Sequence, residues 1–525
     1  MKRAIWRAAL RFLVLLLVVE SFSSVGICQA TALNADSSPA PEKIVSAEVL
    51  KDLDRVIEQN RKLETQNQEL MEQIESLRLL LKKQAEPEAG TPETHDVLAK
   101  SPDINAGDAA SNGQASAAAS VETTPQAQKK WGTYTPNFGF KLANTEYGDL
   151  NLSTFAYVRY LNQRLLAPTS TNSFGTVSNI QQRQDVELNK VQFKFLGWLL
   201  SEKLRYFLYA WTNNAAMGRS FYIALAGYTG FNFNKHFSLW GGLNGLPGTR
   251  SIEGNFPFWL SVDARESADE FFRPSYSQGV WAKGDITDKL RYHVMVGNNL
   301  STLGVNAAQF NNKFNTFSSA VVWEPTTGEF GPGFGDYEDH QKLATRVGIH
   351  FTRSDENKES QPATDAFENT QIRLTDGTII FTDNIFGPGV TVTDVRLRMS
   401  TIDGGFKYKG KAVEGEYFMR WLDDYKGPGT SIVPNFFDHG FQMQTSAMVV
   451  PRTWQVYLTG SKIFGSHGDP WDTRLGTNFF PFKNRVVRWN NEVIYMAKSP
   501  VGYTAIPFTL GGKGWAFHSN WEIAF

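Results

Sequence analysis

The sequence predicts an all-β fold, a 16-stranded antiparallel transmembrane β-barrel, with an N-terminal periplasmic α-helical coiled coil attached to it. The first observation is the C-terminal segment 515–525, where apolar and polar residues alternate up to the terminal Phe525. The second is a series of sixteen segments of similar character, and the third is an alternation of short and long joints between them. An ordinary β-sandwich gives no reason for that alternation, whereas outer-membrane barrels have tight turns at one end and long loops at the other.

The composition is compatible with a barrel and excludes other classes of protein. The 525 residues carry a net charge of −1, so neither nucleic-acid binding nor a generally basic surface is indicated. Only half of each barrel strand is apolar, which reconciles a mean hydropathy of −0.32 with a membrane protein. Beyond the first 20 residues, no apolar run is long enough to form a membrane helix.

Residues 1–30 have the pattern of a secretory signal peptide. Basic residues precede the apolar stretch 12–19, and small side chains mark a cleavage point after Ala30. Cys28 is the only cysteine of the chain, which excludes an internal disulfide and a cysteine-based metal site. Lipidation of Cys28 is a weaker alternative, because Ile27 precedes it where lipoproteins carry a small residue.

Residues 31–45 are expected to be disordered, and residues 46–84 are expected to form a coiled coil. The seam of the coiled coil alternates in steps of four and three and consists of Val49, Leu53, Val56, Asn60, Leu63, Asn67, Leu70, Ile74, Leu77 and Leu81. Asn60 and Asn67 fall at a positions, where buried asparagine fixes register and oligomer state. The alternative is a solitary amphipathic helix that packs on its own barrel.

Residues 85–130 form a separate segment by composition. They are rich in Ala, Ser, Pro, Gly and Thr and contain almost no large apolar residue. This composition predicts a flexible linker, because such a segment cannot bury enough apolar surface to fold. The barrel domain is therefore expected over residues 131–525.

Sixteen candidate strands are expected in the barrel domain, preceded by a short apolar stretch at 138–145. They combine aromatic and β-branched residues with period-two alternation. In chain order they fall near 150–162, 186–200, 204–213, 221–234, 238–246, 278–286, 290–299, 316–324, 342–354, 395–408, 411–424, 436–450, 454–463, 473–482, 485–497 and 515–525. An even strand number places both ends of the barrel on one side, which is the periplasmic side in outer-membrane barrels.

The joints between these strands fall into two groups. Short joints are expected at 201–203, 234–236, 287–289, 409–411, 451–453 and 483–484, and long ones at 163–185, 247–277, 300–315, 355–394, 425–435 and 464–472. The joint 325–341 departs from this pattern, because its position calls for a short turn but it carries a Gly-rich, acidic insertion.

Period-two alternation also predicts which side chains face the lumen, if the apolar face of each strand is assigned to lipid. The basic residues expected to line the pore are Arg159, Lys190, Lys194, Arg205, Lys283, Arg291, Arg346, Arg396, Arg398, Arg420 and Arg488. The inward acidic residues are Asp285, Glu414, Glu416, Glu492 and Glu522. The basic excess predicts a weak preference for anions. The alternative is that the arginines pair with acidic groups of the lumen and loops, which leaves a general pore.

Residues 138–525 resemble the phosphate-selective porin family, types O and P. The resemblance rests on Phe138-Gly139-Phe140-Lys141-Leu142, on Arg265-Glu266-Ser267-Ala268-Asp269-Glu270-Phe271-Phe272-Arg273-Pro274 before Gly279-Val280, on Gly348-Ile349-His350-Phe351-Thr352-Arg353, and on the C-terminal Phe. A coiled-coil segment also occurs in that family. The resemblance implies a trimeric 16-stranded porin whose third external loop, here 247–277, folds into the lumen as a constriction.

The constriction implied by this resemblance carries its own candidate selectivity residues, which are Arg250, Arg265, Asp269, Glu270 and Arg273. Phosphate-selective members of the family use a ladder of basic residues, to which Arg396, Arg398 and Lys407 could contribute. The loop holds more acidic than basic residues, which argues against phosphate selectivity.

Together these features predict an outer-membrane porin, a homotrimer in contact with outer-membrane lipid, for passive diffusion of small anionic or neutral solutes. The sequence holds no HExxH, GxSxG or phosphate-binding glycine motif, so no enzyme activity, cofactor or metal is expected. The alternative is a structural anchor whose coiled coil binds a periplasmic or cell-wall partner. It is suggested by an N-terminal extension longer than a pore needs.

Overall fold

The computed structural model describes residues 132–135, 138–213, 223–252, 256–310, 314–362, 371–503 and 505–525. The chain divides into two units, Met1–Ile104 and Asn105–Phe525, and all described residues belong to the second. The predicted signal peptide, disordered segment, coiled coil and linker lie outside the described residues, so these four assignments stay predictions.

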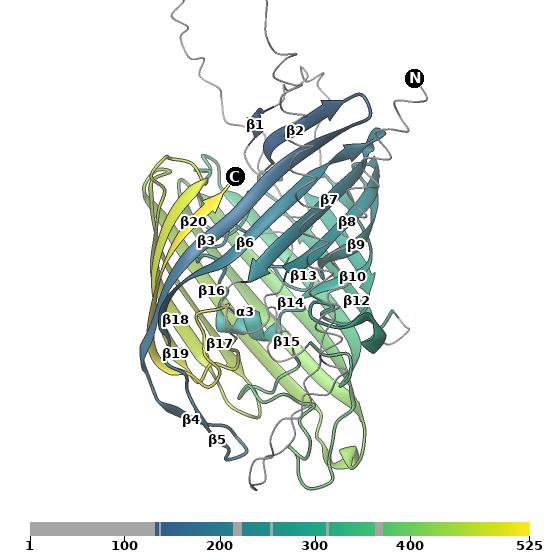
Figure 1. Ribbon diagram of the computed structural model, residues 1–525, viewed down its shortest axis with the longest axis vertical. Helices are drawn as coiled ribbons and strands as arrows, with labels where there is room; N and C mark the ends of the chain where they lie inside the picture. The colour runs from purple at the N-terminus through teal and green to yellow at the C-terminus, as the bar shows by residue number, and fades with distance from the viewer. Residues whose placement is uncertain are drawn as a thin grey trace, which may run out of the picture. The chain divides into compact units, whose positions relative to one another are not determined.

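The described residues form a closed antiparallel barrel (Figure 1). The main sheet contains 18 strands; β1 and β2 extend one edge, and the other sixteen form the wall. Closure comes from the first and last wall strands, because β20 pairs with β3, for example at Asn520↔Arg159. All other wall strands pair with their neighbours in chain order, which confirms the predicted up-and-down barrel of sixteen strands.

The wall strands match the sixteen predicted segments to within a few residues at most ends. They are β3 (Gly148–Leu166), β6 (Gln184–Leu199), β7 (Ser201–Asn213), β8 (Ile223–Asn234), β9 (Phe237–Gly245), β10 (Tyr276–Thr287), β11 (Leu290–Gly297), β12 (Thr316–Trp323), β13 (Ala344–Asn357), β14 (Asp394–Tyr408), β15 (Lys411–Lys426), β16 (Phe436–Val450), β17 (Trp454–Phe464), β18 (Trp471–Phe479), β19 (Val487–Ala497) and β20 (Lys513–Ala524).

The remaining elements are short. The strands outside the wall are β1 (Tyr134–Thr135), β2 (Gly139–Thr145), β4 (Thr169–Thr171) and β5 (Val177–Asn179). The helical elements are α3 (Ser267–Phe272), η2 (Ala307–Gln309) and η3 (Thr430–Ile432). None of the helices in the described residues is long and apolar enough to cross a membrane. The predicted stretch 138–145 is β2, which pairs with the start of β3 and places Phe140 5.6 Å from the terminal Phe525 ring.

The two ends of the barrel differ in the length of their joints. At the short-turn end, β14 and β15 are joined by Lys409 and Gly410, whose φ angles of 47° and 73° are the positive values that a two-residue hairpin turn requires. At the long-loop end, the joints 246–275, 358–393 and 498–512 are each far longer. The predicted alternation of joint length is therefore present over most of the wall. The exceptions are the long joint 324–343 at the short-turn end and the short joint 465–470 at the long-loop end.

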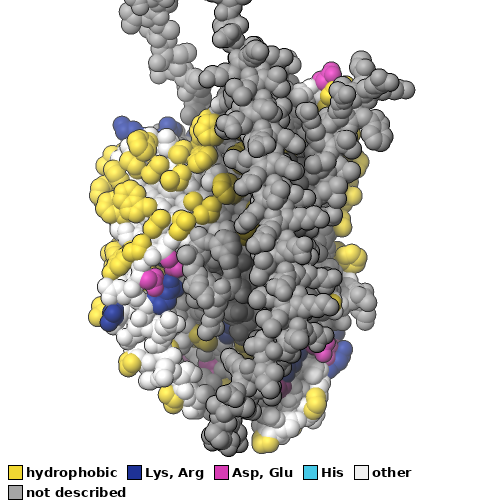
Figure 2. All heavy atoms as spheres, in the orientation of Figure 1, with side chains coloured by type: hydrophobic (Ala, Val, Ile, Leu, Met, Phe, Trp, Pro, Cys, Tyr) yellow, Lys and Arg dark blue, Asp and Glu magenta, His cyan; other side chains and the backbone are white. Residues whose placement is uncertain are grey.

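The outer face carries an apolar band between two aromatic belts. Trp489 stacks on Trp521 near the short-turn end, and Tyr495 contacts Trp515 near the long-loop end. On β17 the eleven residues from Trp454 to Phe464 span about 34 Å, which becomes about 25 Å along the membrane normal at the usual strand tilt. Figure 2 shows hydrophobic side chains covering the visible flank between charged groups above and below. These dimensions match the hydrocarbon band of an outer-membrane barrel.

Most of the buried core lies inside the barrel. An apolar cluster at the long-loop end joins inward residues of the wall, such as Leu397 and Phe418, to Ile380 and Phe381 of the joint between β13 and β14. A second cluster lines β7–β11 with aromatic side chains such as Trp240 and Trp281. The folded joints therefore fill much of the space that the wall encloses.

Candidate functional site: the barrel lumen and its constriction

The constriction loop is the joint between β9 and β10, residues 246–275, and it lies inside the barrel with its helix α3 against β16–β18 (Figure 1). All residues of α3 are buried. The backbone N–H of Ser267 donates to Oδ1 of Asp472 (3.1 Å), and that of Ala268 donates to Oγ of Ser461 (3.0 Å). The wall thereby satisfies N–H groups that the first turn of a helix leaves unpaired. The loop is fixed to this side of the wall.

Four of the predicted constriction residues form one buried network within the loop. Glu270 lies 3.0 Å from Nη1 of Arg265 and 2.9 Å from Nη2 of Arg273. Ser251 donates to Oδ1 of Asp269 (3.0 Å) and accepts from Nε of Arg265 (3.1 Å). The structure brings these four charged side chains together, and their charges largely offset one another inside the loop.

Arg250, the fifth predicted constriction residue, binds the wall instead. Its Nε donates to Oε2 of Glu414 (3.1 Å), and its backbone N–H donates to Oε1 of Glu416 (2.9 Å). Both glutamates are buried on β15, on the inner face where the sequence places them. The constriction loop is thus held on β15 as well as on β16–β18.

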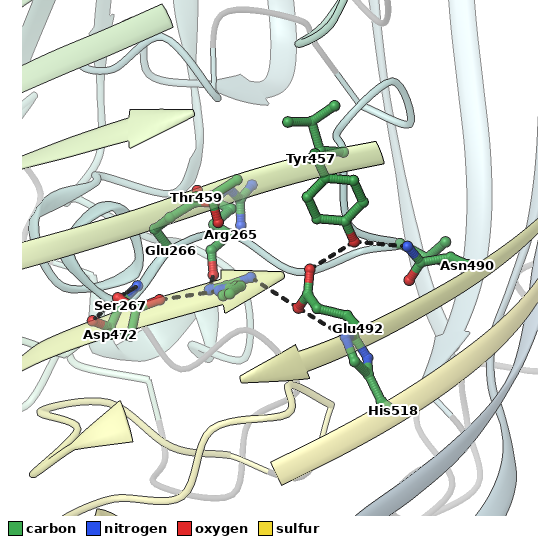
Figure 3. A network of polar contacts seen from close by, with 12 residues as sticks. Arg265, Glu266, Ser267, Tyr457, Thr459, Asp472, Asn490, Glu492 and His518 are labelled. Atoms are coloured by element: carbon green, nitrogen blue, oxygen red, sulfur yellow. Dashed lines mark hydrogen bonds and ion pairs between the residues drawn. The ribbon is translucent and has the colours of Figure 1, made fainter. Parts of the chain in front are cut away.

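A buried polar network lies beside α3, on the inner face of β17–β20 (Figure 3). Nε of Arg474 donates to Oδ2 of Asp472 (3.0 Å), and its Nη1 lies 3.6 Å from Oε1 of Glu492. Glu492 accepts from the Tyr457 hydroxyl (2.7 Å) and lies 2.8 Å from Nε2 of His518. Arg474 also donates to a backbone carbonyl of the constriction loop. One fully buried arginine therefore joins the wall and the loop.

Arg474 and Asp472 are not among the residues predicted to line the lumen, although period-two alternation places them on the inner face of β18. Both alternate with Leu475, whose side chain is 64% exposed on the outer face. The inward acids Asp403 and Asp438 are also missing from the prediction, although the alternation of β14 and β16 places them on the inner face. The predicted basic excess over acid is too large because these three aspartates are absent from it.

Nine of the eleven basic residues predicted to line the pore lie on the inner face. Five of them form ion pairs: Lys190 with Asp263 (2.7 Å), Arg291 with Glu324 (2.7 Å), Arg346 with Asp403 (2.7 Å), Arg420 with Asp438 (2.6 Å), and Arg488 with Glu522. Arg159 is fully buried and donates to backbone carbonyls of Ala505 (2.6 Å) and Val262 (2.8 Å).

The other three inward cations contact rings or backbone. Nζ of Lys194 lies 5.6 Å from the ring centroid of Phe256, and Nζ of Lys283 lies 5.1 Å from that of Trp240. Nε of Arg205 donates to the carbonyl oxygen of Glu202 at the start of the same strand (2.7 Å). A ring face or a carbonyl oxygen solvates a cation without carrying a formal negative charge, in contrast to the carboxylate of an ion pair.

Arg396 and Arg398 lie on the outer face, so the prediction that they line the pore is wrong. On β14 they alternate with the buried Leu397 and Met399 and share a face with the exposed Ile402. They pair there with acidic residues of the adjacent strands. The prediction fails because it equates apolar side chains with lipid contact. At the long-loop end, the apolar face of β14 packs inside the barrel, under the joint between β13 and β14.

The inward cations differ in exposure between two sectors of the wall. Side chains on β6 and β11 reach water, with Lys190 15% and Arg291 26% exposed. Arg346 and Arg420, on β13 and β15, are each 2% exposed beneath the folded loops. In the sector from β6 to β11, inward cations are therefore accessible to solvent, although Lys190 and Arg291 each have an acidic partner.

The anomalous joint 325–341 does not protrude from the short-turn end. The whole joint between β12 and β13, residues 324–343, is called here the inner turn, because Phe330 and residues 332–336 within it are buried. The inner turn is held together by His340, whose Nδ1 lies 2.5 Å from Asp336 and whose Nε2 lies 3.1 Å from Glu329.

The charge of His340 depends on this acidic pair. Partial burial lowers the pKa of His340, but the hydrogen bonds and charges of Asp336 and Glu329 outweigh burial and raise the pKa to about 9. A raised pKa means that the ion pair stabilises the fold fully below the ordinary value of 6.5 and is lost as the pH rises through about 9.

We therefore expect His340→Gln to destabilise the protein at about pH 6 and to have little further effect at about pH 10. Urea unfolding of both proteins at the two pH values measures this. A difference between them that stays constant across the range would show that the charge of His340 contributes nothing.

Comparisons with known proteins give no family match and no match among curated proteins. Among solved structures, the chain is similar to OmpT, an outer membrane protein of Vibrio cholerae in its trimer form, with 10% identity, 72% of this chain and 100% of that chain covered, and a TM-score of 0.46. It is also similar to an anion-selective porin from Comamonas acidovorans, with 9% identity, 72% and 100% coverage and a TM-score of 0.45. A third is the outer membrane channel DcaP of Acinetobacter baumannii, with 7% identity, 73% and 99% coverage and a TM-score of 0.45.

These identities and TM-scores are too low to carry an argument about function. The barrel assignment rests on the strand pairing of this chain. The resemblance to phosphate-selective porins has no support from a family match, and it remains a prediction from the sequence motifs.

Proposed function

We propose that the protein is an outer-membrane porin that lets small hydrophilic solutes diffuse passively through its lumen. The observation that carries this proposal is the contrast between the two faces of a closed wall. The outer face is an apolar band between aromatic belts, and the inner face carries many buried charged and polar side chains beside its apolar clusters. Such a wall separates lipid from water, and an aqueous path through it serves transport.

The proposal includes a location and an orientation. In outer-membrane barrels the short turns lie in the periplasm and the long loops outside the cell. The short-turn end, where β3 begins and β20 ends, is accordingly the periplasmic end. Assembly as a homotrimer and a periplasmic coiled coil at 46–84 belong to the same proposal.

We further propose a weak anion preference that comes from one sector of the lumen. On β13–β20 the buried arginines are largely matched by aspartates and glutamates, so they contribute little net field. On β6–β11 the acids are fewer than the cations: Asp263 pairs with Lys190, Glu324 pairs with Arg291, and Asp285 lies on the inner face of β10. The five inward cations of this sector are Arg205, Lys283 and Arg291 near the short-turn end and Lys190 and Lys194 further in. Positive charge along a narrow aqueous path raises the local concentration of anions.

The proposal is tested by conductance of the purified protein in a planar lipid bilayer. We expect stable ion channels and a reversal potential on the anion side in a salt gradient. Comparing chloride, sulfate and phosphate salts measures any preference for phosphate. Absence of channels from folded protein would refute the porin function, and a cation-side potential would refute only the anion preference.

The selectivity can be traced to particular cations with a matched pair of variants. The double variant Lys190→Gln, Lys194→Gln removes two inward charges, so we expect the anion-to-cation permeability ratio to fall by about twofold. The control Arg396→Gln, Arg398→Gln removes two charges from the outer face and is expected to leave the ratio unchanged. An equal change in both variants would contradict the assignment of selectivity to the β6–β11 sector.

A further inference from the structure

We propose that the inner turn, residues 324–343, is a selectivity element of the pore: it occupies the short-turn end of the lumen and withholds the charges of Arg250 and Lys407 from passing solutes. This inference rests on the proposed porin function and concerns what limits conductance and anion preference. A joint at this end needs only a few residues, so its length and inward course require an explanation.

The sequence of the inner turn allows it to approach the constriction loop closely. Gly328, Gly331, Gly333 and Gly335 all have φ between 71° and 84°, which L side chains rarely adopt. At Gly333 a Cβ atom would lie 2.1 Å from the backbone oxygen of Phe258. Glycine at this position is therefore required by both conformation and space.

The tip of the inner turn is joined to the constriction loop by backbone and by apolar contacts. The N–H of Phe334 donates to the carbonyl of Phe258 (3.0 Å). The Phe334 side chain is 6% exposed and belongs to an apolar cluster with Trp259 and Leu260 of that loop and with Tyr457 of the wall. On this side of the lumen, the two elements form one packed body.

Two lumen cations end on the inner turn. The carbonyl oxygen of Gly333 accepts from Nη2 of Arg250 (2.9 Å) and from Nζ of Lys407 (2.9 Å). The guanidinium of Arg250 lies 5.0 Å from the Phe334 ring, and Nζ of Lys407 lies 4.6 Å from the Phe330 ring. Both side chains are buried and share the carboxylate of Glu414, which lies 3.1 Å from Nε of Arg250 and 4.0 Å from Nζ of Lys407. The rest of their positive charge is solvated by a carbonyl dipole and aromatic faces in place of water or a mobile anion.

The inner turn is also anchored across the mouth of the barrel. Asp336, fully buried, accepts from the N–H of Gly410 in the turn between β14 and β15 (2.8 Å). Glu338 accepts from Nη2 of Arg485 (2.9 Å), between β18 and β19. A segment that starts between β12 and β13 is thus tied to turns as far as β18–β19. It covers the short-turn end over this part of the wall.

The physical consequence is a narrower and less anion-selective path. The inner turn fills volume that a short hairpin would leave to water. It also keeps solutes away from Arg250 and Lys407, two cations that share the carboxylate of Glu414. Displacing it would widen the path and expose two cations. Conductance and anion preference should then rise together.

Two variants test this proposal in planar bilayers. Replacing residues 326–342 by Asn-Gly shortens the joint between β12 and β13 from twenty residues to five. Gly333→Ala keeps the length but places a methyl group against the Phe258 backbone. For both we expect a conductance increase of about twofold or more and a reversal potential shifted further to the anion side.

Gly328→Ala is the matched control, because it introduces the same positive-φ strain at a position where the nearest atom to a Cβ, the Asp288 carbonyl oxygen, is 3.1 Å away and outside the constriction loop. It should conduct like the wild type. Wild-type conductance and selectivity in folded Gly333→Ala and in the shortened variant would overturn the proposal, while the porin function would stand. Absence of channels from the wild type would instead remove the porin function itself.

Discussion

Replacing Arg474 with methionine is expected to lower the free energy of unfolding by about 3–5 kcal/mol. The guanidinium is 1% exposed and lies against Asp472 and Glu492, and it also donates to the backbone of the constriction loop. Methionine fills a similar volume but leaves two buried carboxylates without their cation. The loop should then detach from β18, and conductance in bilayers should become larger or more variable.

Unfolding in urea, followed by the mobility of the folded barrel on gels, measures this loss. Arg398→Met is the matched control, because Arg398 pairs with Asp423 on the outer face with 46% of its side chain exposed. Exposed pairs contribute about 0–1 kcal/mol, so this variant should behave almost like the wild type. Equal losses in the two variants would mean that burial does not set the strength of these pairs.

The sequence was sufficient to predict the wall, because each barrel strand is recognisable from the pattern of its own residues and of the joints beside it. Period-two alternation, turn residues and alternating joint length are properties of neighbouring residues, and they located all sixteen strands. The same local alternation placed Arg346 and Arg488 correctly on the inner face. In both cases the opposite face of the strand is exposed and apolar on the outside of the barrel, as the prediction assumes.

The contents of the lumen could not be predicted in the same way. Which face of β14 is polar at the long-loop end depends on a joint that folds back over it, and Arg396 and Arg398 were misplaced for that reason. The partners of the inward arginines are likewise non-local: Lys190 meets Asp263 of a loop far along the chain. The Gly-rich insertion at 325–341 was visible in the sequence, but its inward course depends on contacts with Phe258 that alternation does not encode.

The placement of the wall in a membrane leads to the second large effect, which is expected for Leu458→Arg. Leu458 is 54% exposed on the outer face of β17, four positions after Trp454 and six before Phe464, so it lies within the apolar band. A lipid-facing arginine near the midplane costs about 2–4 kcal/mol, and the cost falls to about 0–1 kcal/mol near the interfaces.

Val449→Arg is the control, because Val449 is 57% exposed but stands at the short-turn end of β16. Unfolding of both variants in lipid vesicles measures the difference. Only contact with hydrocarbon makes the cost of an outward arginine depend on its height along the wall. If Leu458→Arg cost no more than Val449→Arg, the apolar band would therefore not be in contact with hydrocarbon.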